Sequence, residues 1–283
     1  MHYVSLQALG DNLISLSFLE QLDDKVNIVG TKHTKNIAKL MNLEDKFNVK
    51  VVFDDIPAFY DINKQGIFKA LIDLNKFIKY IRNNDIKEIV FEKKDFRSAI
   101  VSFLTNIKVH TMDDSNPKVY EHRKENIEKA YKEKIVLNRY LLKIYTSKVI
   151  VINPLTRVEF KNIKHNHLKF LIDELNKSDY EVYLIDIEKK YQEFENEVQY
   201  YLTNTTLNDV KNLILKSDLY IGADSFLVHL AYYLKRNYFV IFYRDNYDFF
   251  PPNISNDFYI NANEFGNFNE ELKEKFKNIG LVE

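Results

Sequence analysis

Residues 218–242, DLYIGADSFLVHLAYYLKRNYFVIF, indicate the fold and the place of a binding site more clearly than any other stretch of the chain. An apolar segment at 219–221 leads into Gly222-Ala223-Asp224-Ser225, a helical segment with His229 follows, and a second apolar segment covers 238–242. This order is typical of a strand–helix–strand unit of a parallel sheet. Ligands bind where the first strand of such a unit ends, because the helix N–H groups point into the crevice there. The stretch therefore predicts a site for an anionic, sugar-like ligand.

Short apolar segments alternate with helical-period segments along almost the whole chain, which predicts an α/β fold with parallel sheets and helices on both faces. The expected strands lie near residues 2–6, 26–29, 49–53, 87–91, 107–110, 149–152, 181–185, 218–221, 238–242 and 257–260. The expected helices lie near residues 12–22, 34–41, 66–83, 96–104, 119–144, 166–177, 207–216, 225–235 and 269–278. Because the long polar helix at 119–144 separates two such series, we expect two Rossmann-like domains, residues 1–145 and 146–283.

The composition limits the class of protein. A chain of 283 residues is long enough for two domains of about 140 residues each. Its formal net charge of -1 gives no overall attraction to nucleic acid, and the absence of cysteine excludes a disulfide framework. The N-terminus lacks a signal-peptide pattern, and no apolar run approaches the roughly 18 residues needed to span a bilayer. We therefore expect a cytoplasmic protein with no nucleic-acid partner.

Gly10-Asp11-Asn12 follows the first expected strand and precedes an amphipathic helical segment. Glycine suits a tight turn between strand and helix, and helix capping by itself explains Asp11. Equally, a carboxylate that the helix field keeps ionised can accept a proton from an acceptor hydroxyl. The sequence leaves both interpretations open.

Asn153-Pro154-Leu155-Thr156-Arg157 and the following residues to Lys161 begin where another expected strand ends. A hydroxyl, a guanidinium and an ammonium are the groups that hold a diphosphate and neutralise its charge as it leaves. A solvated loop with two incidental cations is the alternative. Two interpretations are also open for the segment with Asp224, Ser225 and His229. The aspartate or serine can cap the helix while the histidine packs in the core, or the segment can bind phosphate and sugar hydroxyls.

The sequence contains no Walker A loop, no G-x-G-x-x-G motif and no H-E-x-x-H helix. Three acidic pairs can bind a divalent ion or lie in surface turns, namely Asp23-Asp24, Asp54-Asp55 and Asp113-Asp114. We expect no metal site, because Arg157, Lys161 and helix N-termini can together stabilise a leaving diphosphate.

Taken in order, these segments resemble glycosyltransferase family nine, the heptosyltransferases of lipopolysaccharide inner-core assembly. The matching segments are residues 9–13, residues 95–99, His122-Arg123 with Asn126, residues 153–161, and residues 222–231. The resemblance implies the GT-B fold, in which two Rossmann-like domains with parallel sheets face a central cleft. It implies metal-independent transfer of a sugar with inversion, typically heptose from ADP-heptose, and no cofactor besides this nucleotide-sugar substrate.

The resemblance also implies a role for individual residues. The catalytic residues would be Asp11, as general base, and Lys161. The donor-binding residues would be Asn153, Thr156, Arg157, Lys161, Asp224, Ser225, Phe226 and His229, in a C-terminal nucleotide-sugar domain. The acceptor-binding residues would be Asn12, Arg97, His122 and Arg123, in an N-terminal acceptor domain. The implied acceptor is a glycolipid or surface glycan, which places the protein peripherally at the inner face of the cytoplasmic membrane.

Three features depart from the family pattern. Phe226 stands where the family has a small residue, Leu155 occupies the phosphate loop, and residues 243–252 replace a Gly-Pro-rich loop. These departures leave three alternatives open. The protein can use a different donor, it can bind a nucleotide-sugar or glycan without turnover, or it can be a GT-B nucleotide-sugar epimerase. Basic and aromatic residues at 64–87 and 118–134 can touch an anionic bilayer or form ordinary solvated helix faces.

Overall fold

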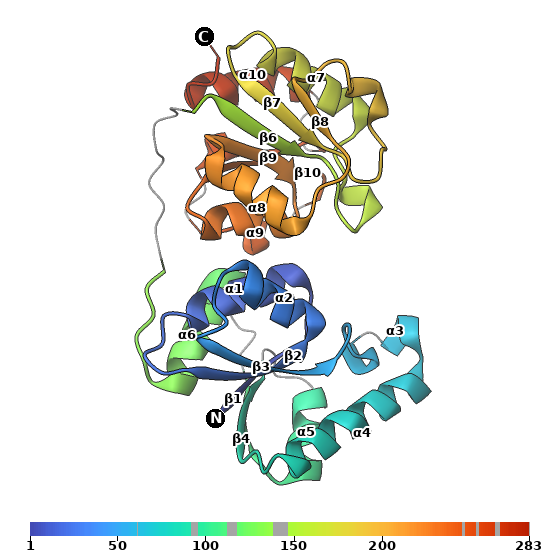
Figure 1. Cartoon of the computed structure of the whole chain (residues 1–283), viewed down its shortest axis with the longest axis vertical. Coiled ribbons are helices and arrows are strands. Elements are labelled where there is room, and N and C mark those ends of the chain that lie inside the picture. The colour runs from blue at the N-terminus through green and yellow to red at the C-terminus, as the bar shows by residue number, and fades with distance from the viewer. Residues whose placement is uncertain are drawn as a thin grey trace. The chain divides into compact units, whose positions relative to one another are not determined.

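The computed structural model describes residues 1–60, 62–91, 96–111, 118–137, 147–244, 247–252, 255–263 and 267–282. The chain divides into two compact units, Met1–Asn138 and Arg139–Glu283 (Figure 1). The boundary expected between residues 145 and 146 falls within 138–146, outside the described residues. Across the described ranges, no helix combines the length and apolar character needed to cross a bilayer.

The first unit is a parallel sheet with the strand order β3-β2-β1-β4-β5. Its strands are β1 (His2–Ser5), β2 (Val26–Thr31), β3 (Phe47–Phe53), β4 (Glu88–Phe91) and β5 (Lys108–Thr111). Its helices are α1 (Leu9–Leu19), α2 (Lys32–Leu40), α3 (Ile62–Gln65), α4 (Ile67–Asn83), α5 (Phe96–Thr105) and α6 (Val119–Tyr131), with a short turn η1 (Ala58–Tyr60).

The second unit is a parallel sheet with the strand order β11-β10-β9-β6-β7-β8. Its strands are β6 (Val149–Asn153), β7 (Glu181–Ile185), β8 (Tyr200–Leu202), β9 (Leu219–Ala223), β10 (Asn237–Phe242) and β11 (Tyr259–Asn261). Its helices are α7 (His165–Leu175), α8 (Leu207–Lys216), α9 (Phe226–Tyr233) and α10 (Phe268–Asn278). Both sheets confirm the predicted parallel α/β architecture.

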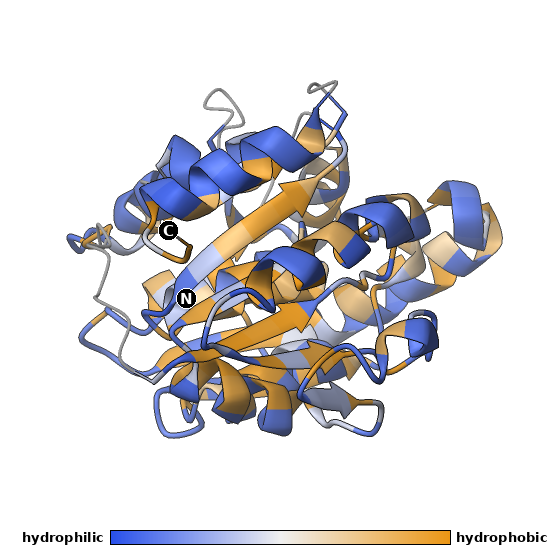
Figure 2. Ribbon diagram, turned by 90° about the horizontal axis from the view of Figure 1, so that it is seen from above, coloured by the Kyte–Doolittle hydropathy of each residue, from blue (hydrophilic) through white to orange (hydrophobic). Residues whose placement is uncertain are grey.

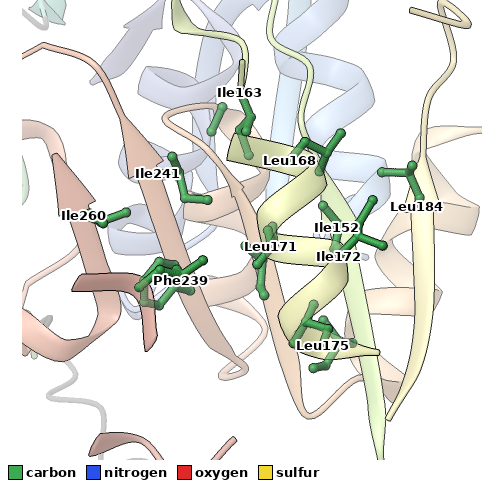
Figure 3. Close-up of a cluster of buried hydrophobic side chains, with 14 of the residues drawn as sticks. Ile152, Ile163, Leu168, Leu171, Ile172, Leu175, Leu184, Phe239, Ile241 and Ile260 are labelled. Atoms are coloured by element: carbon green, nitrogen blue, oxygen red, sulfur yellow. The ribbon is translucent and has the colours of Figure 1, made fainter. Parts of the chain in front are cut away.

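The core of the second unit explains why its strands are so apolar. β9 and β10 are buried along their whole length, as expected for central strands covered by helices on both faces. Figure 2 shows strands that are largely hydrophobic and helices that are mixed in character. Figure 3 shows apolar side chains of α7 packed beside those of β6, β7 and β10, among them Leu168, Leu171, Ile172, Leu175, Ile152, Leu184 and Phe239.

β6 and β9 lie side by side at the switch point of the second sheet, where the chain stops adding strands on one side of β6 and continues on the other side. This arrangement places two sequence motifs together. Asn153, the last residue of β6, is in register with Gly222 of β9. The loops that follow these adjacent parallel strands therefore leave from the same edge of the sheet. This is the position where open α/β sheets bind ligands.

Three sequence-based expectations about the elements were wrong. α1 begins at Leu9 with Ala8 as its N-cap, so Gly10 and Asp11 lie inside the first turn and Asp11 does not cap the helix. The helix expected over 119–144 ends at Tyr131, because Lys132 adopts a left-handed conformation (φ 59°) and the chain then turns to bury Ile135. The three-residue strand β8 was missed because so short an edge strand carries little alternation.

Gly222 has to be glycine because the buried Tyr220 ring lies against it. A Cβ atom at residue 222 would lie 2.7 Å from Cζ of Tyr220, with the hydroxyl oxygen closer still. We expect Gly222→Ala to lower the free energy of unfolding of the second unit by about 1–3 kcal/mol. Urea unfolding measures the loss, and adding Tyr220→Phe should recover part of it because the nearest atom is then removed. Equal stability of Gly222→Ala and the parent would contradict this packing.

Candidate active site

Two sequence motifs of the second unit meet in an ion pair at the carboxyl ends of β6 and β9. Lys161, in the short turn η2 (Glu159–Lys161), lies with Nζ 2.6 Å from Oδ2 of Asp224, which directly follows β9. The Lys161 side chain is 31% exposed and that of Asp224 is 10% exposed. An ammonium group has three N–H donors, so two remain after the bond to Asp224. The sequence placed both residues in the donor site but did not predict their direct contact.

The loop between β6 and η2 is held in shape by its own polar side chains. Oδ1 of Asn153 accepts a hydrogen bond from the Leu155 amide (3.1 Å), and the Thr156 amide donates to Oδ1 of Asn162 (2.7 Å). The Thr156 hydroxyl donates to the Val158 carbonyl (2.7 Å) and accepts from the Val158 amide (3.0 Å). Asn153 and Thr156 therefore fix the shape of the loop, whatever ligand it binds.

The other predicted donor-binding residues lie on this loop and at the start of α9. Arg157 is exposed and has no hydrogen bond or ion pair among the described residues. Ser225 is the N-cap residue of α9, but its side chain makes no capping bond. The first N–H groups of an α-helix have no acceptor within the helix, so they can bind an anion. Phe226 is half-buried in this first turn, and His229 is buried at 8% exposure.

In the first unit, Asp11 is paired with an arginine that the sequence assigned to the acceptor. Oδ1 of Asp11 lies 3.4 Å from Nη2 of Arg123 on α6, and Nη1 of Arg123 donates to Oγ of Ser15 (3.2 Å). The Arg123 side chain is 4% exposed, whereas that of Asp11 is 30% exposed. A buried guanidinium thus holds a carboxylate that still reaches solvent. The sequence did not predict this contact between residues 112 positions apart.

Asn12 is fully buried and joins three segments of the first unit. Its Nδ2 donates to the Gln7 carbonyl (2.9 Å), and its Oδ1 accepts from the hydroxyls of Ser5 and Thr34, the latter at 3.3 Å. The side chain thereby fixes the turn from β1 into α1. Its acceptor-binding role remains a prediction, for a side chain that has no exposed surface in this structure.

Arg97 and His122 lie on different helices of the first unit. The Arg97 guanidinium lies 4.2 Å from the ring centre of Tyr60, and Nη1 approaches the Phe59 carbonyl at 3.5 Å. His122 is buried on α6, one residue before Arg123. Asp95, from the same motif as Arg97, lies in 92–95, outside the described residues. The acceptor-binding roles of Arg97, His122 and Arg123 also remain predictions.

The sequence missed a hydrogen-bonded aromatic cluster between the segment that follows η2 and the end of β10. The Tyr243 hydroxyl, just after β10, accepts from the Lys164 amide (2.8 Å) and is hydrogen-bonded to Nδ1 of His167 (2.9 Å). The His167 ring stacks on Phe268 with 4.0 Å between ring centres. Burial raises the pKa of Tyr243 to about 12, so the phenol stays protonated. No local pattern signals this cluster, because Tyr243 lies more than 70 residues along the chain from its partner His167.

Among the residues whose positions are described, no three His, Asp or Glu side chains gather as metal ligands. Asp54 pairs with Lys32 (2.8 Å) and Asp55 with His33 (3.2 Å). The pair Asp113-Asp114 lies in 112–117, outside the described residues.

With this geometry established, comparison with known proteins identifies the family. A model of glycosyltransferase family 9 (heptosyltransferase) matches residues 117–278, more than half of the chain. The chain belongs to glycosyltransferase family 9. It is a heptosyltransferase-like glycosyltransferase, as its motifs predicted. No curated protein sequence matches it.

Solved structures of similar fold support the same architecture. E. coli heptosyltransferase WaaC with ADP-2-deoxy-2-fluoro heptose has a TM-score of 0.66 at 13% identity, covering 99% of this chain and 100% of that chain. The family 9 glycosyl transferase from Veillonella parvula also has a TM-score of 0.66, at 12% identity over 99% and 89% of the two chains. E. coli ADP-heptose lps heptosyltransferase II has a TM-score of 0.60 at 15% identity over 99% and 100%. At these identities the matches establish the fold alone, and they confirm the predicted GT-B class.

Proposed function

We propose that this protein transfers heptose from ADP-heptose, with inversion, to the core of a lipopolysaccharide or lipooligosaccharide or to a related surface glycan. The observation that carries the proposal is the Lys161–Asp224 pair at the switch point of the second sheet, in a chain of family 9. This pair brings together an ammonium group that can bind a diphosphate and a carboxylate that can accept hydrogen bonds from sugar hydroxyls. A structure of WaaC, a protein of similar fold, contains ADP-2-deoxy-2-fluoro heptose, which supports an ADP-linked donor.

We assign the donor to the second unit. The two remaining N–H donors of Lys161, the exposed Arg157 and the first N–H groups of α9 supply positive charge and hydrogen bonds for two phosphates. Asp224 can accept hydrogen bonds from the sugar hydroxyls, and Ser225, Phe226 and His229 line the start of the same helix. The loop shaped by Asn153 and Thr156 presents these groups.

We assign the acceptor to the first unit, with Asp11 as general base. The acceptor hydroxyl gives its proton to the Asp11 carboxylate while its oxygen attacks the anomeric carbon of the donor sugar. The bond from that carbon to the diphosphate oxygen breaks, its electron pair leaves with ADP, and attack from the opposite face inverts the configuration. Lys161 and Arg157 stabilise the charge that develops on the diphosphate. Arg97, His122 and Arg123 would bind or orient the acceptor, which we expect at the inner face of the cytoplasmic membrane.

The proposal is tested by incubating the protein with ADP-heptose, ADP-glucose, UDP-glucose and GDP-mannose, with and without core glycolipid. We expect nucleoside diphosphate release only with both ADP-heptose and the glycolipid, at a rate that EDTA leaves unchanged. Tight donor binding without release in any combination would support the non-catalytic alternative. Conversion of a donor sugar without acceptor would support the epimerase alternative.

A further inference from the structure

The first unit exposes a group of large apolar side chains on two adjacent helices. Phe68 on α4 is 82% exposed and Phe103 on α5 is 86% exposed. Bulky apolar side chains that are this exposed on neighbouring helices mark a candidate binding surface. We call the full set the α4–α5 patch; its members are Ile67, Phe68, Leu71, Ile72, Phe103 and Leu104.

The beginning of α4 projects from the core, and this exposes the four patch residues that lie on α4. The buried residues of α4 lie mainly in its second half, at Phe77, Ile78 and Ile81, with Ala70 the one buried residue of the first two turns. Figure 1 shows α3 and the first turns of α4 at the outer edge of the unit, with α5 beside α4. Apart from Ala70, the apolar side chains of these turns lie outside the core.

The helix that carries most of the patch also carries an excess of positive charge. α4 carries Lys69, Lys76, Lys79 and Arg82 against a single carboxylate, Asp73, and that carboxylate accepts a hydrogen bond from the Ala58 amide (2.8 Å). α5 contains an arginine and no acidic residue. Since the whole chain has a formal net charge of -1, this is a local excess of cations.

The cations and the apolar residues share one side of the surface. Phe68, Ile72, Lys79 and Arg82 follow one another at spacings of four, seven and three residues, which places them on one face of an α-helix. Arg82 also donates a hydrogen bond to the Leu104 carbonyl, so the cationic end of α4 adjoins the end of α5.

We propose that the α4–α5 patch docks this protein on an anionic phospholipid bilayer, with the aromatic and aliphatic side chains inserted among the headgroups. A helix whose exposed side combines bulky apolar residues with cations can bind an anionic membrane surface in this way. A second copy of the chain fits less well, because a two-fold contact through the patch would bring the same cations of both copies together. The inference deepens the proposed function by naming the surface that meets a lipid-borne acceptor, but lipid binding itself does not depend on the transfer reaction.

The test is sedimentation of the whole protein with vesicles of phosphatidylcholine alone or with 30% phosphatidylglycerol. We expect the protein to bind the anionic vesicles only. Each α4 cation that is removed by substitution or screened by salt should weaken this binding about fivefold. The double variant Phe68→Ser/Ile72→Ser should bind at least about tenfold more weakly. Its matched control is Ile187→Ser/Phe249→Ser, which removes the same two residue types at exposed positions of the second unit and should bind like the parent.

Three outcomes would overturn the proposal. They are equal binding to neutral vesicles, loss of binding in the control variant, and a concentration-dependent dimer that the Phe68→Ser/Ile72→Ser variant abolishes. Circular dichroism checks that both variants fold, as expected for substitutions at exposed positions. Transfer to a detergent-solubilised acceptor should be unchanged in the patch variant, so this inference and the proposed reaction can fail separately.

Discussion

Asp11→Ala should lower kcat by about 10²–10⁴-fold while the affinity for the nucleotide-sugar stays that of the parent. The physical reason is that in the proposed reaction Asp11 takes the proton of the acceptor hydroxyl, whereas the proposed donor contacts belong to the other unit. Single-turnover assays with core glycolipid measure the chemical step, and calorimetry with ADP measures donor binding.

The pairing of Asp11 with Arg123 makes a second variant necessary. Removal of the carboxylate leaves a guanidinium at 4% exposure without this counter-charge, so Asp11→Ala should also cost about 1–2 kcal/mol of stability. Asp11→Asn keeps a hydrogen-bond acceptor for Arg123 but cannot take a proton. Loss of activity in Asp11→Asn with normal melting therefore identifies the base, whereas restored activity would mean that Asp11 only positions Arg123.

Asp209→Asn is a matched control for helix-start effects. Asp209 occupies the third position of α8, as Asp11 does in α1, and its carboxylate caps the helix together with Thr206. We expect this variant to lose stability through its capping box and to retain kcat. A comparable fall in kcat would show that the assay reports folding and not proton transfer.

The sequence predicted the architecture because strand and helix periods depend on local residue order. The alternation at 218–242 correctly predicted β9, α9 and β10, to within two residues at the start of each element. It erred where a single backbone conformation or a distant partner decides the outcome. Lys132 ends α6 in a left-handed backbone conformation that the helix propensities of the residues do not predict. Burial of Ile135 stabilises the chain in this conformation.

The sequence named the residues of the candidate site but did not predict the contacts between them. Motifs at the ends of two expected strands brought Lys161 and Asp224 into the prediction, but their pairing follows from the strand order that sets β6 beside β9. Asp11 and Arg123 likewise meet only because α6 returns to pack on α1. Such contacts depend on topology, which local patterns constrain without specifying.

Lys161→Ala should lower kcat/KM by about 10³-fold, because it removes the charge-assisted hydrogen bond to the diphosphate, and the stabilisation of its developing charge, that we propose for Lys161. It should also weaken ADP binding, which distinguishes it from Asp11→Ala. Steady-state kinetics and calorimetry with ADP measure the two effects. Lys177→Ala is the matched control, since Lys177 bonds the buried Glu174 carboxylate at 2.5 Å but lies outside the site; we expect it to retain full kcat/KM.

The double variant Lys161→Ala/Asp224→Ala separates stability from catalysis. Lys161→Ala alone leaves a carboxylate at 10% exposure without the ammonium beside it, so the second unit should lose about 1–3 kcal/mol of stability. Removing both partners should recover part of that stability, with a coupling energy measurable in a double-mutant cycle. Activity should not recover with it, because the proposed diphosphate site still lacks its cation. Parallel recovery of stability and activity would mean that the pair only holds the loop together and that the donor phosphates bind elsewhere.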